Sequence, residues 1–294
     1  MSWIENEKTG YQQILDTIFK SLGNAYRIGI TGPPGAGKST LTNQLTKIFR
    51  DENLKTGIVA VDPTSPFTGG AILGDRIRMN DLTMDRGVFI RSMATRGSSG
   101  GLARQATEVA DVLDAAGYDI IIYETVGVGQ VELDIAQAAD TTVVIVVPES
   151  GDIIQSLKSG LMEIADIFIL NKSDRPGAER MQKDIEYVLH LRDPKIAWYP
   201  EVIQTVAHKG EGVNRLRQQI AKHQDFQNTD GHLQAKRDAR LKGHIERIIR
   251  HGLEYNFWNE DRRRAIRAYL DEDKKDLSPY VLADKMMGKI SGLK

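Results

Sequence analysis

The chain has 294 residues, of which 40% are hydrophobic and 27% are charged, an ordinary balance for a globular protein. Its 39 basic and 40 acidic residues give a formal net charge of -1. This balance excludes binding to nucleic acid or to an anionic membrane that is driven by overall net charge. The absence of cysteine excludes disulfides and thiolate metal sites. Residues 1–8 lack the order of a signal peptide, and the longest aliphatic run, residues 143–147, is too short to cross a bilayer. We therefore expect a cytoplasmic protein that binds neither nucleic acid nor a membrane.

Residues 1–25 carry apolar side chains at helical spacing, which predicts a short helical extension with one buried face that stops near Gly23. Between residues 26 and 222, helical patterns alternate with apolar segments that we expect to be strands. The predicted strands are Tyr26–Thr31, Gly57–Asp62, Gly87–Met93, Asp119–Thr125, Thr141–Val147, Asp166–Lys172 and Val202–Ala207. Most are continuous runs of isoleucine and valine, as in strands that are covered on both faces. The sequence therefore predicts an α/β fold with a mostly parallel sheet sandwiched by helices, whose functional residues gather at the carboxyl ends of the strands.

A glycine-rich segment connects the first predicted strand to a helical pattern. Residues 32–39 match the phosphate-binding pattern G-x-x-x-x-G-K-[ST] in the strand–loop–helix context that it requires. Glycines allow backbone N–H groups to turn towards phosphate oxygens, and the start of the helix adds unpaired donors. We expect Lys38 to reach the β- and γ-phosphates as a catalytic residue, and the Ser39 hydroxyl to bind Mg²⁺. The predicted phosphate-binding residues are Gly32, Pro33, Pro34, Gly35, Ala36, Gly37, Lys38, Ser39 and Thr40.

Three carboxylates that follow predicted strands are candidate Mg²⁺ ligands together with Ser39, directly or through water. Asp62 ends the second strand, and Asp75 lies in the following segment, which has the composition of a switch that orders around a γ-phosphate. The alternatives are that Asp62 is a turn residue and that Asp75 is a surface partner of Arg78. Glu124 ends the fourth strand in a Glu-x-x-Gly sequence, where nucleotide switches usually have Asp-x-x-Gly. We predict a catalytic, metal-linked role for Glu124, with a helix cap or a turn as the alternative.

The sixth predicted strand runs into Asn171-Lys172-Ser173-Asp174, which matches the pattern N-K-x-D. A carboxylate at Asp174 can accept hydrogen bonds from N1–H and the amino group of guanine, whereas adenine would leave it unpaired, so this residue can select GTP and GDP. Asn171 is expected to hold neighbouring loops, and the Lys172 stem to cover the base. After the seventh strand, the backbone at Val206 and Ala207 is expected to donate an N–H to the guanine carbonyl.

The composition shifts from residue 223 onward. Leu241, Ile245, Ile248, Ile249 and Leu253 form the apolar stripe of an amphipathic helix, and residues 278–287 predict a further helix that begins with proline. We therefore expect three parts: a helical extension in residues 1–25, a nucleotide-binding domain in residues 26–222, and a helical arm in residues 223–294 that favours self-association.

Together with the phosphate loop, residues 61–70, 74–76, 124–130 and 171–174 make the chain closely resemble the methylmalonyl-CoA mutase-associated GTPases (MeaB/ArgK, MMAA-like) over roughly residues 26–290. This family belongs to the SIMIBI-class P-loop GTPases. The resemblance implies hydrolysis of GTP to GDP and phosphate by a chaperone for an adenosylcobalamin-dependent acyl-CoA mutase, and a homodimer formed through the C-terminal helices. It places Asp62 and Asp75 on a first switch and Glu124 at the start of a second.

The resemblance changes the interpretation of the segment after the fifth predicted strand. By spacing alone, Gln155 and Lys158 are ordinary solvated residues on one side of a helix. The resemblance instead implies that Gly151–Lys158 is a third switch, in which Gln155 and Lys158 are catalytic residues once the mutase is bound. The extension before the phosphate loop is shorter than is usual in the family, and Thr64 stands where serine is common.

Two other classes of function are open. A metal-delivery GTPase would need a cargo site, but the six histidines are scattered and cysteine is absent. The resemblance also leaves open a kinase that uses the same phosphate loop and acts on a transport protein, but the guanine-selective pattern at residues 171–174 and the lack of an evident acceptor pocket argue against it.

Overall fold

The computed structural model describes residues 1–62, 80–94, 104–125, 131–149, 160–191, 197–271 and 276–288. The chain divides into two compact units, residues 1–237 and 238–294. The expected boundary between residues 222 and 223 falls inside helix α10, and the first unit continues beyond it to Arg237.

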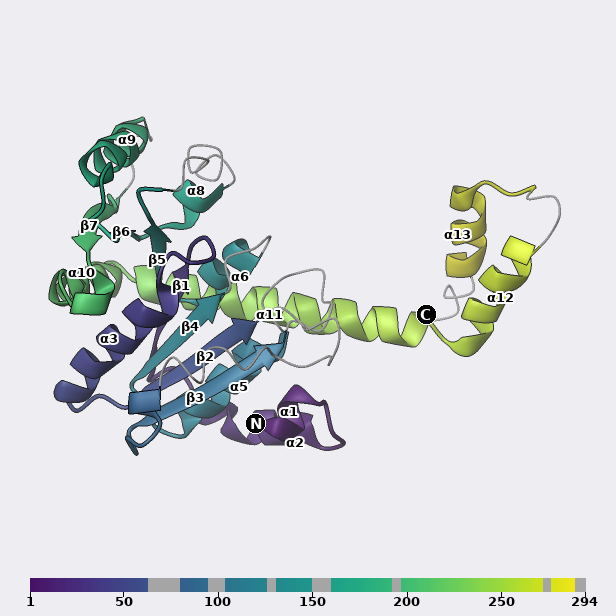
Figure 1. Cartoon of the computed structure of the whole chain (residues 1–294). Helices are drawn as coiled ribbons and strands as arrows, with labels where there is room; N and C mark the ends of the chain where they lie inside the picture. Colours follow the sequence, from purple (N-terminus) through teal and green to yellow (C-terminus); the bar gives the residue numbers. More distant parts are fainter. Residues whose placement is uncertain are drawn as a thin grey trace. The chain divides into compact units, whose positions relative to one another are not determined.

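A sheet of seven parallel strands forms the centre of the first unit, in the order β3-β2-β4-β1-β5-β6-β7 (Figure 1). The strands are β1 (Tyr26–Thr31), β2 (Thr56–Asp62), β3 (Val88–Ala94), β4 (Ile120–Thr125), β5 (Thr141–Val146), β6 (Ile167–Asn171) and β7 (Glu201–Thr205). The predicted α/β fold with a parallel sheet is confirmed. β1 has its predicted bounds, and the largest difference is at β7, which ends at Thr205 instead of Ala207.

Successive residues of a strand point to opposite faces of the sheet, and the residues on both faces are apolar. Helices therefore cover both faces. Ile122 packs in one cluster with Leu45 of α3, whereas its neighbour Ile121 packs in another with Leu113 of α5. Each such side chain, fully buried, contributes about 1.5–3 kcal/mol. The helical segments of this unit after β1 are α3 (Lys38–Asp51), η2 (Asn80–Leu82), α5 (Arg104–Ala115), α6 (Val131–Ala138), α8 (Met162–Ile164), α9 (Ala178–His190), η4 (Ala207–Lys209) and α10 (Val213–Asn228).

The N-terminal extension is helical, as predicted, but its burial differs from the prediction. It consists of α1 (Ser2–Glu5), α2 (Tyr11–Ile18) and η1 (Phe19–Ser21), and α1 and α2 pack on α5. Ile4 is the only buried residue of these three helices, and Ile14 and Phe19 are 40% and 55% exposed. The helical spacing predicted the helix correctly. It did not predict how much of the helix is buried, because burial depends on which elements pack against it.

The second unit contains most of α11 (His232–Phe257), with α12 (Glu260–Asp271) and α13 (Pro279–Met287). The predicted proline start of α13 is confirmed, and the Ser278 hydroxyl caps this helix by accepting the N–H of Val281 at 3.3 Å. All members of the apolar stripe on α11 are more than 40% exposed: Leu241, Ile245, Ile248, Ile249 and Leu253. Across the described part of the chain, we find no helix with the length and apolar character to span a membrane.

Candidate nucleotide-binding site

The phosphate loop connects β1, in the middle of the sheet, to α3 (Figure 1). Two of its glycines are required by close approach of neighbouring strands. Gly32 has φ +143°, and a Cβ there would lie 2.2 Å from the carbonyl oxygen of Ile145 in β5. Gly37 has φ +97°, and its Cβ would lie 2.3 Å from Nδ2 of Asn171 at the end of β6. The sequence motif is therefore also a packing requirement of this sheet.

Lys38 is buried, and its ammonium bends back across the loop. Its Nζ donates to the carbonyl oxygens of Gly32 at 2.8 Å and Pro33 at 2.9 Å. α3 begins at Lys38, so Lys38, Ser39 and Thr40 form its first turn, where the backbone N–H groups point towards the end of the helix that faces the loop. An ammonium and a helix start thus converge on one loop, which suits an anionic ligand.

The Ser39 hydroxyl and the Glu124 carboxylate lie together at the carboxyl end of the central strands. Ser39 Oγ donates to Glu124 Oε1 at 2.5 Å, and both residues are buried. The contact forms because β1 pairs with β4, in a register that places Glu124 opposite Ile30. A hydroxyl oxygen and a carboxylate oxygen are both hard ligands for a metal ion, so these two residues fit Mg²⁺.

The rest of the predicted metal set cannot be placed. Asp62 ends β2, which pairs with β4, but its side chain and the whole of Asp75 lie outside the described residues. Gln155 and Lys158, the predicted residues of a third switch, also lie outside them. Among the residues that are described, no cluster of three or more histidine and acidic side chains could hold a metal.

Asn171 joins three separate segments. Its Nδ2 donates to the carbonyl oxygen of Ala36 in the phosphate loop at 2.7 Å, across 135 residues of sequence. Its Oδ1 accepts the Thr205 hydroxyl at 3.1 Å and the Ala207 N–H at 3.0 Å. The predicted loop-holding contacts of Asn171 are thus present, and the amide fixes the phosphate loop relative to the end of β7.

Asp174 follows a sharply turned backbone. Lys172 is in the left-handed region with φ +58°, and both the N–H and the hydroxyl of Ser173 donate to the Thr205 carbonyl at 3.1 Å. This turn leaves the Asp174 side chain 38% exposed, with Lys209 Nζ at 3.9 Å. A carboxylate held on a fixed turn and open to solvent can accept hydrogen bonds from a ligand.

The backbone donor expected after β7 is already engaged. Ala207 gives its N–H to Asn171 Oδ1, and Val206 gives its N–H to the Glu211 carbonyl at 3.1 Å. The Thr205 hydroxyl and Lys209 were missed by the sequence analysis. No local pattern marks Thr205, because its partner Asn171 is 34 residues away, and only the position of Lys209 just after a strand could have indicated it.

A buried polar cluster lies at the opposite edge of the sheet, where the strands begin. The Thr141 hydroxyl is 2.6 Å from the Tyr26 hydroxyl and 2.8 Å from Nδ1 of His223, while Asp166 Oδ1 is 3.5 Å from its Nε2. Burial lowers the pKa of His223 from 6.5 to about 4. A neutral imidazole is thereby maintained near neutral pH, away from the phosphate loop.

The fold and the site define a P-loop nucleotide-binding α/β protein. The family model described as "Methylmalonyl Co-A mutase-associated GTPase MeaB" matches residues 1–262, and the chain belongs to this family of P-loop GTPases. It is a GTPase, like its named relatives, and the resemblance derived from the sequence is confirmed.

Individual relatives support the same assignment. A putative GTPase of Pyrococcus abyssi is 46% identical over 98% of this chain and 90% of its own length. GTPase ArgK of Escherichia coli is 37% identical over 92% of this chain and 84% of its own length. The crystal structure of an LAO/AO transport system kinase aligns with a TM-score of 0.72 and 31% identity, over 95% of this chain and 86% of that one.

Proposed function

We propose that this GTPase hydrolyses GTP with Mg²⁺ as the chaperone of an adenosylcobalamin-dependent acyl-CoA mutase, with methylmalonyl-CoA mutase as the first candidate. The proposal rests on the family and on one observation, the contact between Glu124 and Ser39, the residue that follows Lys38 at the start of α3. A hydroxyl, a carboxylate and an ammonium are the groups that a magnesium–triphosphate complex needs, which supports the proposal.

Positioning and charge neutralisation are the main needs of phosphoryl transfer. In this chain, Lys38 would exchange its bonds to the Gly32 and Pro33 carbonyls for phosphate oxygens, and the first turn of α3 would donate N–H groups. Mg²⁺, when bound, neutralises phosphate charge, and Ser39 with Glu124 would hold it. Asp174 would select guanine, while Asn171 keeps the base and phosphate ends of the site in register.

The partner is proposed from the family description, which names a methylmalonyl-CoA mutase. Among the described residues, we find no side chain clearly placed to orient the attacking water. We therefore expect slow hydrolysis by the chain alone and faster hydrolysis when a mutase completes the site, with Gln155 and Lys158 as the proposed additional groups. Hydrolysis measured with and without the cognate mutase tests this, and equal rates would contradict it.

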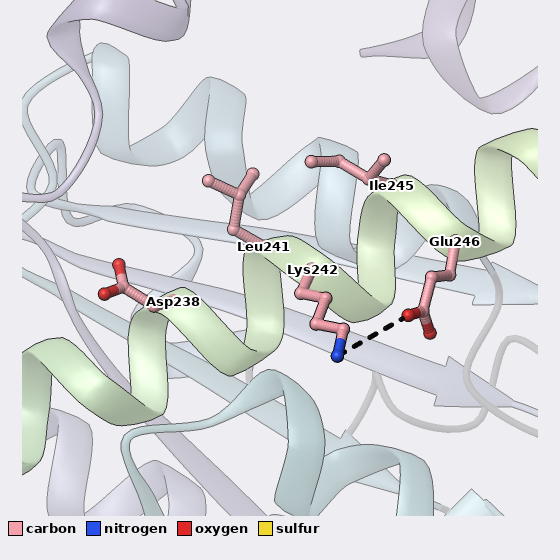
Figure 2. Close-up of a pocket in the computed structure, with 5 residues that line it drawn as sticks. All are labelled: Asp238, Leu241, Lys242, Ile245 and Glu246. Atoms are coloured by element: carbon pink, nitrogen blue, oxygen red, sulfur yellow. Dashed lines mark ion pairs between the residues drawn. The ribbon is translucent and has the colours of Figure 1, made fainter.

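A homodimer is proposed for the second unit. The α11 stripe exposes several large apolar residues on a described helix. Figure 2 shows a shallow pocket on this helix, where Leu241 and Ile245 project on one side and Lys242 pairs with Glu246 at 4.0 Å. Burying such a stripe against a second copy would remove apolar surface from water, which favours association.

A kinase is the second candidate, because the similar crystal structure is that of a protein named as a transport system kinase. Incubation with GTP labelled at the γ-phosphate separates the two functions. Release of free phosphate supports hydrolysis, whereas a labelled acceptor protein supports the kinase.

A further inference from the structure

A lysine outside the predicted guanine-binding residues lies beside the selecting carboxylate. Nζ of Lys209 is 3.9 Å from Oδ2 of Asp174, and the two side chains are 50% and 38% exposed. This separation is too long for a hydrogen bond, so the ion pair leaves the ammonium donors available. A surface pair of this kind contributes little to stability, typically about 0–1 kcal/mol. Fold stability alone therefore does not explain the arrangement.

Both residues are carried by loops with fixed geometry. η4, which ends in Lys209, is held by the bond from the Ala207 N–H to Asn171, and the Lys209 N–H bonds back to the Val206 carbonyl at 2.9 Å. The loop then turns at Gly212, which has φ +80° and whose Cβ would lie 2.2 Å from the Gln204 carbonyl oxygen. Because the supporting loops are braced, little ordering is needed when a ligand binds.

We propose that Lys209 is a second specificity-determining residue of the guanine site, donating to the O6 carbonyl while Asp174 accepts from N1–H and the 2-amino group. The guanine edge presents one acceptor next to two donors, and an ammonium next to a carboxylate is its complement. Adenine carries an amino group at position 6 and no proton on N1, so it meets both residues with the wrong polarity. The inference rests on the proposed use of guanine nucleotides at this site.

Calorimetry of the full chain with GDP and with 6-thio-GDP tests the proposal. The sulfur compound keeps N1–H and the 2-amino group but is a much weaker acceptor at position 6. We expect Lys209→Met to weaken GDP binding about tenfold and to change 6-thio-GDP binding little, since only O6 loses a charged donor. Lys209→Arg should keep most of the preference for GDP. Lys222→Met, at a lysine of α10 outside the site, is the matched control and should leave both affinities unchanged.

The alternatives give different results. If Lys209 only steadies the Asp174 carboxylate, both nucleotides should lose affinity equally, and the proposal would be wrong. Unchanged GDP binding in Lys209→Met would also overturn it, and Lys209→Gln provides a second removal of the charge if the methionine variant folds poorly. Failure of the unmodified chain to bind GDP would instead contradict the proposed function.

Discussion

The Ser39 hydroxyl donates to the Glu124 carboxylate at 2.5 Å, although the two residues are 85 positions apart. The contact joins the helix start after the phosphate loop to the end of the neighbouring strand β4. It brings together two motifs that the sequence shows only separately. Substitutions at these residues and at the groups around them should therefore have distinct effects on nucleotide, metal and base recognition.

Replacing Lys38 with alanine should weaken GTP and GDP binding at least about a hundredfold, because the site loses its charge-assisted donors. Equilibrium dialysis or calorimetry measures the effect. Lys47→Ala is the matched control on the same helix, since Lys47 pairs with the exposed Asp81 at 2.6 Å outside the phosphate loop. Near-normal affinity in the Lys38 variant would contradict the assignment of the loop.

Replacing Glu124 with glutamine keeps the shape of the side chain but removes its charge. We expect nucleotide binding without metal to persist, while the Mg²⁺ concentration for half-maximal hydrolysis rises about tenfold or more, because a carboxylate is a better ligand for a hard cation than an amide. A magnesium titration of the GTPase rate measures this. Glu201→Gln, in an exposed pair with Arg215, serves as the control, and an unaltered magnesium requirement would remove Glu124 from the metal site.

Asp174→Asn should shift the preference of the site from guanosine towards xanthosine nucleotides. The amide can donate to the 2-oxo group of xanthine, whereas it meets the amino group of guanine with a donor. Competition between GDP and XDP reports the change. Asp184→Asn on α9, where the aspartate is exposed near Arg180, is the control and should keep the guanine preference. If the Asp174 variant also keeps the guanine preference, Asp174 does not select the base.

Ile245→Asp should turn the proposed homodimer into a monomer, since a charge would have to be buried in the contact. Light scattering after size-exclusion chromatography measures the mass. Arg250→Asp places the same side chain at an exposed polar position of α11 and should remain dimeric. If the unmodified chain and the Ile245 variant have the same mass, this stripe is not the interface.

His223 predicts an acid-sensitive contribution to folding. Burial holds its folded pKa near 4, below its usual 6.5, so the unfolded chain takes up the proton first. The stability due to neutral His223 is therefore fully present above pH 6.5 and is lost as the pH falls towards 4, by up to about 3 kcal/mol. The charged groups that act on the ring are Asp166 and Asp140, which raise its pKa, and Lys236, which lowers it.

Urea unfolding between pH 7 and pH 4 measures this contribution as a difference between the unmodified chain and His223→Gln. The glutamine variant should be less sensitive to acid, because its side chain does not titrate. Parallel curves for the two proteins would show that protonation of His223 is not linked to unfolding.

The sequence by itself determined the features that depend on contiguous residues. The parallel sheet followed from apolar runs that are buried on both faces, and the phosphate loop followed from glycines at positions where the backbone turns. The pattern from Asn171 to Asp174 was recognisable for the same reason, because its chemistry lies within four neighbouring residues. The family was predicted correctly because several such local patterns occur together.

The tertiary structure decided which distant groups meet. Only packing shows that Asn171 holds Ala36 and takes the Ala207 N–H, or that Lys209 lies beside Asp174. The same holds for α2, whose apolar spacing is real although none of its residues is buried. A local pattern specifies backbone conformation and periodicity, whereas the partner of a side chain depends on the register of strands and loops that are far apart in the chain.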